Sequence, residues 1–212
     1  MPLAALAGAL VSGVALYALA WRGGMQGQRF VLVGIGIAAL AQAGVGYVLT
    51  EGRIFEVAQA YVWLVGSVNG RDWGQVWPLA ATLAILTPAL GALARRADAL
   101  ELGDDLARAL GVGVEGSRLA LLAAAVALTG IAVAAAGPVG FVALVAPHLA
   151  RRLGRPASLL ELLPLAAACG AALVVACDLA GRVAFAPTEI PVGLLTSIVA
   201  APYFLLLMRR AA

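Results

Sequence analysis

Long stretches without a charged residue recur along the chain and limit its fold more than any other feature. They occupy residues 1–21, 30–50, 73–94, 119–147, 162–177 and 190–208. An α-helix needs about 20 apolar residues to cross the hydrocarbon core of a bilayer. Only 12% of the 212 residues are charged and 63% are hydrophobic, whereas about 25% are charged in ordinary soluble domains. The sequence therefore predicts an all-α, polytopic membrane helix bundle.

The run 119–147 is too long for a single membrane span, and it contains a strong helix-breaking sequence. This sequence is Gly137-Pro138-Val139-Gly140, in which proline removes a backbone donor and glycine frees the backbone. We expect one helix before the break and a shorter one after it, which gives about seven membrane segments. The fifth segment is short enough to be re-entrant, which is tolerated only where protein or a water-filled cavity covers its backbone.

The distribution of arginines predicts the orientation of these segments. All 14 basic residues are arginines, and with seven alternating segments only Arg53, Arg71 and Arg182 fall on one side. The opposite side collects Arg22, Arg29, Arg95, Arg96, Arg108, Arg118, Arg151, Arg152, Arg155, Arg209 and Arg210. Arginine-rich loops stay in the cytoplasm, so we expect a cytoplasmic C-terminus in a bacterial inner membrane. The excess of basic over acidic residues therefore reflects membrane topology and gives no reason to expect nucleic acid as a partner.

Two polar connections are long enough to carry function. The outer one covers residues 51–75 and is expected to contain a short helix at 55–65. The inner one covers residues 95–118, and within it residues 101–111 have the pattern of a short amphipathic helix. Asp104 and Asp105 favour its start through the helix dipole, Gly111 favours its end, and Leu106 and Leu110 share one face. This helix is either a linker resting on the membrane or a docking element for a cytoplasmic partner.

Sequence patterns for chemistry are weak, and we predict no catalytic, cofactor-binding or metal-ligating residue. The G-x-G-x-x-G match at residues 111–116 has no strand before it and a membrane span after it, so nucleotide binding is not expected. His148 is the single histidine, and we expect it to bond a backbone carbonyl near a helix end. Asp178 and Glu189 are weak intramembrane candidates. The uncharged spans argue against a secondary transporter, and the scattered polar groups argue against a membrane-embedded enzyme.

Several segments together resemble the FecCD family of ABC importer permeases, the vitamin B12 and ferric-siderophore group. Residues 101–113 are similar to its cytoplasmic loop, and residues 137–151 to its most recognisable signature. Residues 163–165, 176–182, 189–196 and 201–204 follow in the family order, and residues 61–71 are similar to the siderophore branch. The signature residues carried over are Gly137, Pro138, Gly140, Pro147 and His148.

The resemblance implies a permease subunit that imports a ferric siderophore, with cobalamin or haem as alternative substrates. It implies a cytoplasmic ATPase subunit, an external substrate-binding protein and a second permease subunit, identical or different. Residues expected to couple to the ATPase are Leu102, Gly103, Asp104, Ala107, Leu110 and Gly111. Arg182 matches the docking arginine for acidic groups of the binding protein, and Arg53 and Arg71 are weaker candidates or, like Arg182, plain topology markers.

The length of the chain departs from the family pattern. Family permeases usually have ten membrane helices in two related halves, and this chain resembles the fourth to the tenth. We therefore expect residues 1–212 to form one permease domain that lacks three helices. A truncated reading frame, a fragment, one piece of a split permease and a non-transporting relic all stay open.

Overall fold

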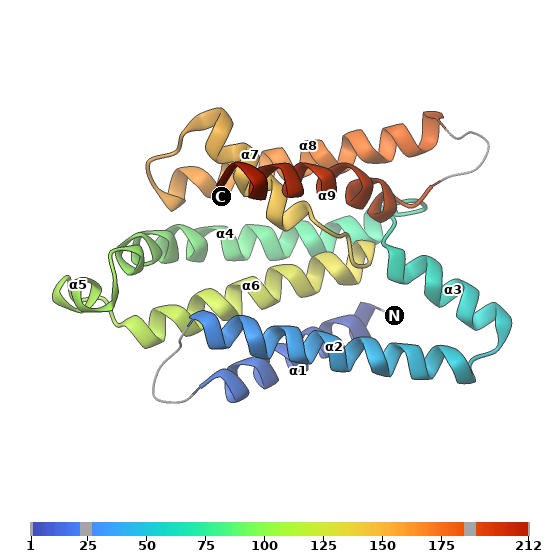
Figure 1. Cartoon of the computed structure of the whole chain (residues 1–212), viewed down its shortest axis with the longest axis horizontal. Coiled ribbons are helices and arrows are strands. Elements are labelled where there is room, and N and C mark those ends of the chain that lie inside the picture. The colour runs from blue at the N-terminus through green and yellow to red at the C-terminus, as the bar shows by residue number, and fades with distance from the viewer. Residues whose placement is uncertain (1, 22–26, 185–189, 212) are drawn as a thin grey trace. The chain divides into compact units, whose positions relative to one another are not determined.

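The computed structural model describes residues 2–21, 27–184 and 190–211, and the regular elements in these ranges are all α-helices (Figure 1). They are α1 (Pro2–Ala20), α2 (Gly27–Glu51), α3 (Ile54–Val65), α4 (Trp73–Glu101), α5 (Asp104–Ala109), α6 (Val114–Ala136), α7 (Val142–Gly154), α8 (Leu159–Ala184) and α9 (Val192–Ala211). The all-α prediction is confirmed, and each expected membrane segment and each of the two short connecting helices corresponds to one of these elements.

Four helices in the described ranges are long and apolar enough to cross a membrane, namely α2, α4, α6 and α8. Shorter apolar stretches occupy Ala4–Ala20 in α1 and Val192–Phe204 in α9. Helix α7 has 13 residues, and at about 1.5 Å per residue it is too short for a hydrocarbon core of about 30 Å. The expectation of a short fifth segment is therefore confirmed.

Several helices extend beyond the uncharged runs that predicted them, and α4 and α8 do so most clearly. Helix α4 continues past residue 94 to Glu101, and α8 covers Leu159–Ala184 where the run covers 162–177. The inner connection 95–118 is consequently mostly helical. The reason is that charged residues end a membrane span without ending a helix, and neither glycine nor proline interrupts α4 between Gly91 and its end.

The chain divides into two compact units, which are described separately. The first consists of Met1–Ala60 and Pro78–Ala134, and in it α1 packs against α2 (Figure 1). Helix α1 also approaches α6 closely through glycines. A Cβ atom on Gly13 would lie 2.9 Å from Cγ2 of Val126, and one on Gly130 would lie 3.0 Å from Cβ of Ala9. Small residues at these crossings give the close backbone approach that stabilises helix pairs in lipid.

The second unit consists of Tyr61–Trp77 and Ala135–Ala212, and its centre is the packing of α7 against α8 and α9. The buried residues of these helices are small or medium in size. They are Val145, Ala146 and Ala150 of α7, Leu162, Gly170, Cys177 and Gly181 of α8, and Val192, Gly193, Thr196 and Ala200 of α9. The short helix α7 is therefore covered by protein along one face, which is the condition for an incomplete span in a membrane.

Candidate functional site

Backbone geometry at two glycines defines the short helix α5. Gly103 precedes it with φ 99°, and Gly111 follows it with φ 78°. At its end the amide of Gly111 donates to the carbonyl of Arg108, and the amide of Val112 donates to that of Ala107, both at 2.9 Å. These two bonds with a left-handed glycine form a Schellman motif. The amphipathic helix expected within residues 101–111, with Gly111 as its stop, is confirmed.

The leucines of this segment face outward. Leu102, Leu106 and Leu110 are 59%, 57% and 64% exposed, whereas Ala107 is fully buried. Val114, at the start of α6, is also buried, at 3%. The small side chain of Ala107 is therefore the part of α5 that faces the protein. The larger apolar side chains, those of the three leucines, face away from the protein. Such an outward apolar face on a connecting helix fits a docking element.

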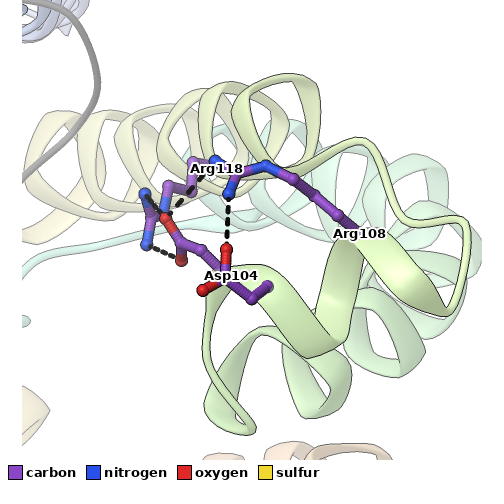
Figure 2. A network of polar contacts seen from close by, with 4 residues as sticks. Asp104, Arg108 and Arg118 are labelled. Carbon is purple, nitrogen blue, oxygen red and sulfur yellow. Dashed lines mark hydrogen bonds and ion pairs between the residues drawn. The ribbon is translucent and has the colours of Figure 1, made fainter.

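A network of ion pairs links α5 to α6. Figure 2 shows Arg118 and Arg108 pointing towards Asp104. Nη2 of Arg118 donates to Oδ1 of Asp104 at 2.7 Å, and Nη1 donates to Oδ2 at 3.2 Å. Arg108 lies 3.9 Å from Asp104 and donates to Asp105 at 3.2 Å. Asp104 thus begins α5 and also binds the second turn of α6.

A crossing of three backbone segments, here called the glycine junction, is formed by Gly66, Gly137 and Gly193. The amide of Gly193 donates to the carbonyl of Gly66 at 3.1 Å, and the amide of Ser67 donates to that of Ala136 at 2.8 Å. Gly66 and Gly137 have φ of 79° and 75°. The junction therefore connects the end of α3, the end of α6 and the start of α9.

Side chains are excluded from this junction by backbone atoms. A Cβ on Gly193 would collide with the carbonyl oxygen of Val65, and one on Gly66 with that of Pro138. A Cβ on Gly137 would lie 2.5 Å from the carbonyl oxygen of Trp63. The helix break predicted at residues 137–140 is confirmed, because α6 ends at Ala136 and α7 begins at Val142. The sequence alone did not identify Gly66 and Gly193 as positions that exclude a side chain. The reason is that their constraint comes from contacts between segments far apart in the chain.

The other signature residues lie in or beside α7. Nδ1 of His148 lies 3.2 Å from the carbonyl oxygen of Leu144, which can only accept, so Nδ1 carries the hydrogen in this bond. The expected bond to a backbone carbonyl is confirmed, but the expected position near a helix end is wrong, because His148 is the seventh of the 13 residues of α7. Pro147 stands inside α7. A Cβ on Gly140 would approach Oγ of Ser197 to 3.1 Å, which brings the signature loop against α9.

Arg182 lies in the last turn of α8 and forms an ion pair with a residue one turn earlier. Its Nε donates to Oδ2 of Asp178 at 2.8 Å, and the side chains are 45% and 26% exposed. The basic group also suits the negative end of the helix dipole. Asp178, an intramembrane candidate in the sequence, is therefore paired, whereas Glu189 lies outside the described residues.

The two weaker docking candidates are exposed and occupy connections. Nε of Arg71 donates to the carbonyl of Ser67 at 3.4 Å. Arg53 lies between α2 and α3, and it belongs to the first unit whereas Arg71 and Arg182 belong to the second. The topology residue Arg22 lies outside the described residues.

A cavity of about 420 Å³ opens between α1, α2 and α6. Its walls are small and apolar, with Gly13, Gly34 and Ala38 among them, and Ser12 and Thr129 supply the polar side chains of its lining. No ionisable group lines it, so it offers no charge to hold an anionic ligand.

Comparison with known proteins gives relatives along nearly the whole chain. It is 41% identical over 208 residues to the achromobactin transport system permease protein CbrC of Dickeya dadantii, covering 98% of this chain and 59% of that protein. It is 40% identical over 206 residues to the ferric enterobactin transport system permease protein FepG of Escherichia coli, covering 97% and 62%. The hemin transport system permease protein HmuU of Yersinia pestis is 40% identical over 208 residues, covering 97% and 61%.

The fold has a counterpart among solved structures. An inward-facing metal-chelate type ABC transporter superposes with a TM-score of 0.81 at 26% sequence identity, over 97% of this chain and 63% of that one. The chain thus spans about three fifths of the length of the relatives it matches. With four candidate spans, it is a multi-pass membrane protein. The FecCD transport family matches residues 1–210, and together with identities of about 40% this shows that the chain belongs to that family.

Proposed function

We propose that this chain is a transmembrane permease subunit of an ABC importer that moves a ferric siderophore across the inner membrane of a bacterium. Residues 1–212 form one permease domain with an outer connection at 51–75 and an inner, ATPase-coupling connection at 95–118. ATP is hydrolysed on a separate cytoplasmic subunit, and the chain itself performs no chemical reaction. The C-terminus lies in the cytoplasm of a bacterial cell, on the side with most arginines.

The names of the relatives support an iron chelate as the transported substrate. Two of those described above are named for achromobactin and ferric enterobactin, and one for hemin, at 41%, 40% and 40% identity. Because these identities are nearly equal, they do not separate siderophore from haem. The siderophore assignment rests in addition on residues 61–71, which resemble the siderophore branch, and haem and cobalamin are the alternatives.

The observation that carries the proposal is the outward apolar face of α5. Leu102 and Leu110 are available to a partner, Gly103 and Gly111 set the bounds of the helix, and Ala107 packs inward. A cytoplasmic ATPase subunit is the partner that this family requires. The segment therefore serves as the coupling helix, with Asp104 fixing its first turn.

The proposed mechanism is alternating access. Two permease subunits enclose a central path, and a binding protein loaded with the chelate docks on the outside. ATP binding and hydrolysis on the cytoplasmic subunits move the coupling helices, and the membrane helices move with them. The chain contributes two alternative packings, and its partners shift the population between them.

The test is ATP hydrolysis in liposomes that contain the chain assembled with its ATPase subunit and its permease partners. We expect hydrolysis to rise when binding protein loaded with a ferric siderophore is added, and to stay low with empty binding protein. The same binding protein loaded with hemin or cobalamin identifies the substrate class. The proposed function would be contradicted if the rate of ATP hydrolysis did not change with any loaded binding protein while the ATPase stayed attached.

Reversal of the charge at Arg182 is expected to weaken docking of the binding protein. Charges at the rim of an interface act mainly on the association rate and its salt dependence, so Arg182→Glu should slow association about tenfold at low salt and less at high salt. Biolayer interferometry with the permease in nanodiscs measures both. Arg151→Glu is the matched control, because Arg151 is exposed and falls on the predicted cytoplasmic side. Equal association rates for both variants would refute a docking role for Arg182.

A further inference from the structure

Two hydrogen bonds join Arg118 to Asp104, and the family resemblance gives no role to Arg118. Arg118 is the fifth residue of α6, and Asp104 is the first residue of α5. Both terminal nitrogens of Arg118 donate to Asp104, one to each carboxylate oxygen, at 2.7 and 3.2 Å. A two-point contact of this kind fixes the orientation of a carboxylate as well as its distance.

The pair is better shielded from water than the neighbouring ion pair. The side chains of Arg118 and Asp104 are 26% and 37% exposed, whereas those of Arg108 and Asp105 are 56% and 103% exposed. Exposed ion pairs contribute little because water and salt screen them. The bonds made by Arg118 are therefore the ones expected to hold α5 in place (Figure 2).

A six-residue helix has no stable orientation of its own. Helices shorter than about 12 residues are marginal in water, so the direction of α5 is set by its contacts. Its N-cap position, Gly103, supplies no side-chain cap. Ala107 of α5 and Val114 and Ser117 at the start of α6 are buried, and their small side chains offer little resistance to rotation of a short helix.

We propose that the Arg118–Asp104 pair clamps the coupling helix α5 to the membrane helix α6, so that the two move as one body. Arg118 is then a positioning residue: it does not touch the ATPase, but it transmits the displacement of α5 to a 23-residue helix that spans the membrane. This inference rests on the proposed function, in which α5 receives the ATPase.

The test compares Arg118→Gln with the unmodified chain in the assembled importer in liposomes. ATPase binding to the permease, ATP hydrolysis and siderophore uptake are measured on the same preparation. We expect the ATPase to stay bound and uptake per ATP hydrolysed to fall about fivefold or more, within the range of couplings between distant sites. A pair that only stabilises the fold would instead lower bound ATPase, hydrolysis and uptake in proportion.

Three further variants make the result decisive. Arg118→Lys keeps the charge with a single-point contact and should restore part of the uptake per ATP. Arg152→Gln removes an equally charged, exposed residue from the last turn of α7, outside the coupling connection, and should change nothing. If Arg118→Gln does not assemble, the exchange of Asp104→Arg with Arg118→Asp rebuilds the pair, and uptake per ATP should return towards the unmodified value.

Two results would overturn the inference. One is unchanged uptake per ATP in Arg118→Gln, and the other is an exchange variant that assembles but leaves uptake uncoupled. Failure of the proposed function gives a different result, because the unmodified importer would then show no hydrolysis in response to loaded binding protein.

Discussion

Replacement of Gly193 by alanine is expected to disrupt the glycine junction and destabilise the protein severely. The added Cβ would occupy the position of the carbonyl oxygen of Val65, and the neighbouring carbonyl of Gly66 would lie 3.2 Å away. Overpacking usually costs about 1–3 kcal/mol, and we expect the upper end or more here because a backbone oxygen has no rotamer to change. The amide of Gly193 would also lose its bond to Gly66.

The measurement is the temperature at which the detergent-solubilised protein loses its monodisperse peak in size-exclusion chromatography. Gly116→Ala is the matched control, since a Cβ there meets nothing within 4 Å and Gly116 lies in the first turn of α6. In a helix this change is expected to stabilise slightly, by about 0.5–1 kcal/mol. Equal unfolding temperatures for Gly193→Ala and Gly116→Ala would show that the junction is not rigid.

The features that the sequence predicted correctly are set by local physics. The uncharged runs produced the long helices, because a membrane span needs a fixed length of apolar residues. The break after Ala136 followed from Gly137 and Pro138, and the end of α5 followed from Gly111, whose left-handed backbone is a property of a few neighbouring residues. The carbonyl bond of His148 was likewise a contact within one helical turn.

The features that were missed depend on residues far apart in the chain. Gly66 and Gly193 belong to segments 61–71 and 189–196, which the sequence singled out, but only the crossing of α3, α6 and α9 shows why neither glycine tolerates a side chain. Arg118 was interpreted as one topology arginine among many, whereas its guanidinium bonds Asp104, 14 residues earlier. A single sequence, considered alone, contains no signal for either pairing. Site residues at local breaks were therefore predictable, and those that join segments were not.

Introduction of a charge at Leu106 is expected to weaken binding of the ATPase subunit strongly without unfolding the permease. Leu106 is 57% exposed and belongs to the outward face of α5, so its replacement leaves no cavity in the chain. In the assembled importer a buried carboxylate would replace an apolar contact at the centre of the interface. Truncation of a hot-spot residue near the centre of an interface costs about 2 kcal/mol or more, so Leu106→Glu should weaken binding by roughly thirtyfold or more if Leu106 is such a residue.

Titration of labelled ATPase subunit against nanodisc-embedded permease measures this affinity, and ATP hydrolysis by the reconstituted complex measures its consequence. Leu153→Glu provides the control, because Leu153 is 74% exposed at the end of α7 and receives the same chemical change outside the coupling helix. Undiminished affinity in Leu106→Glu would show that α5 is a linker helix and that the ATPase subunit binds to another part of the permease. Loss of binding in Leu106→Glu together with retained binding in Arg118→Gln would separate two roles of this segment. The outward leucines would bind the ATPase subunit, and the ion pair with α6 would transmit the movement of α5 to the membrane helix.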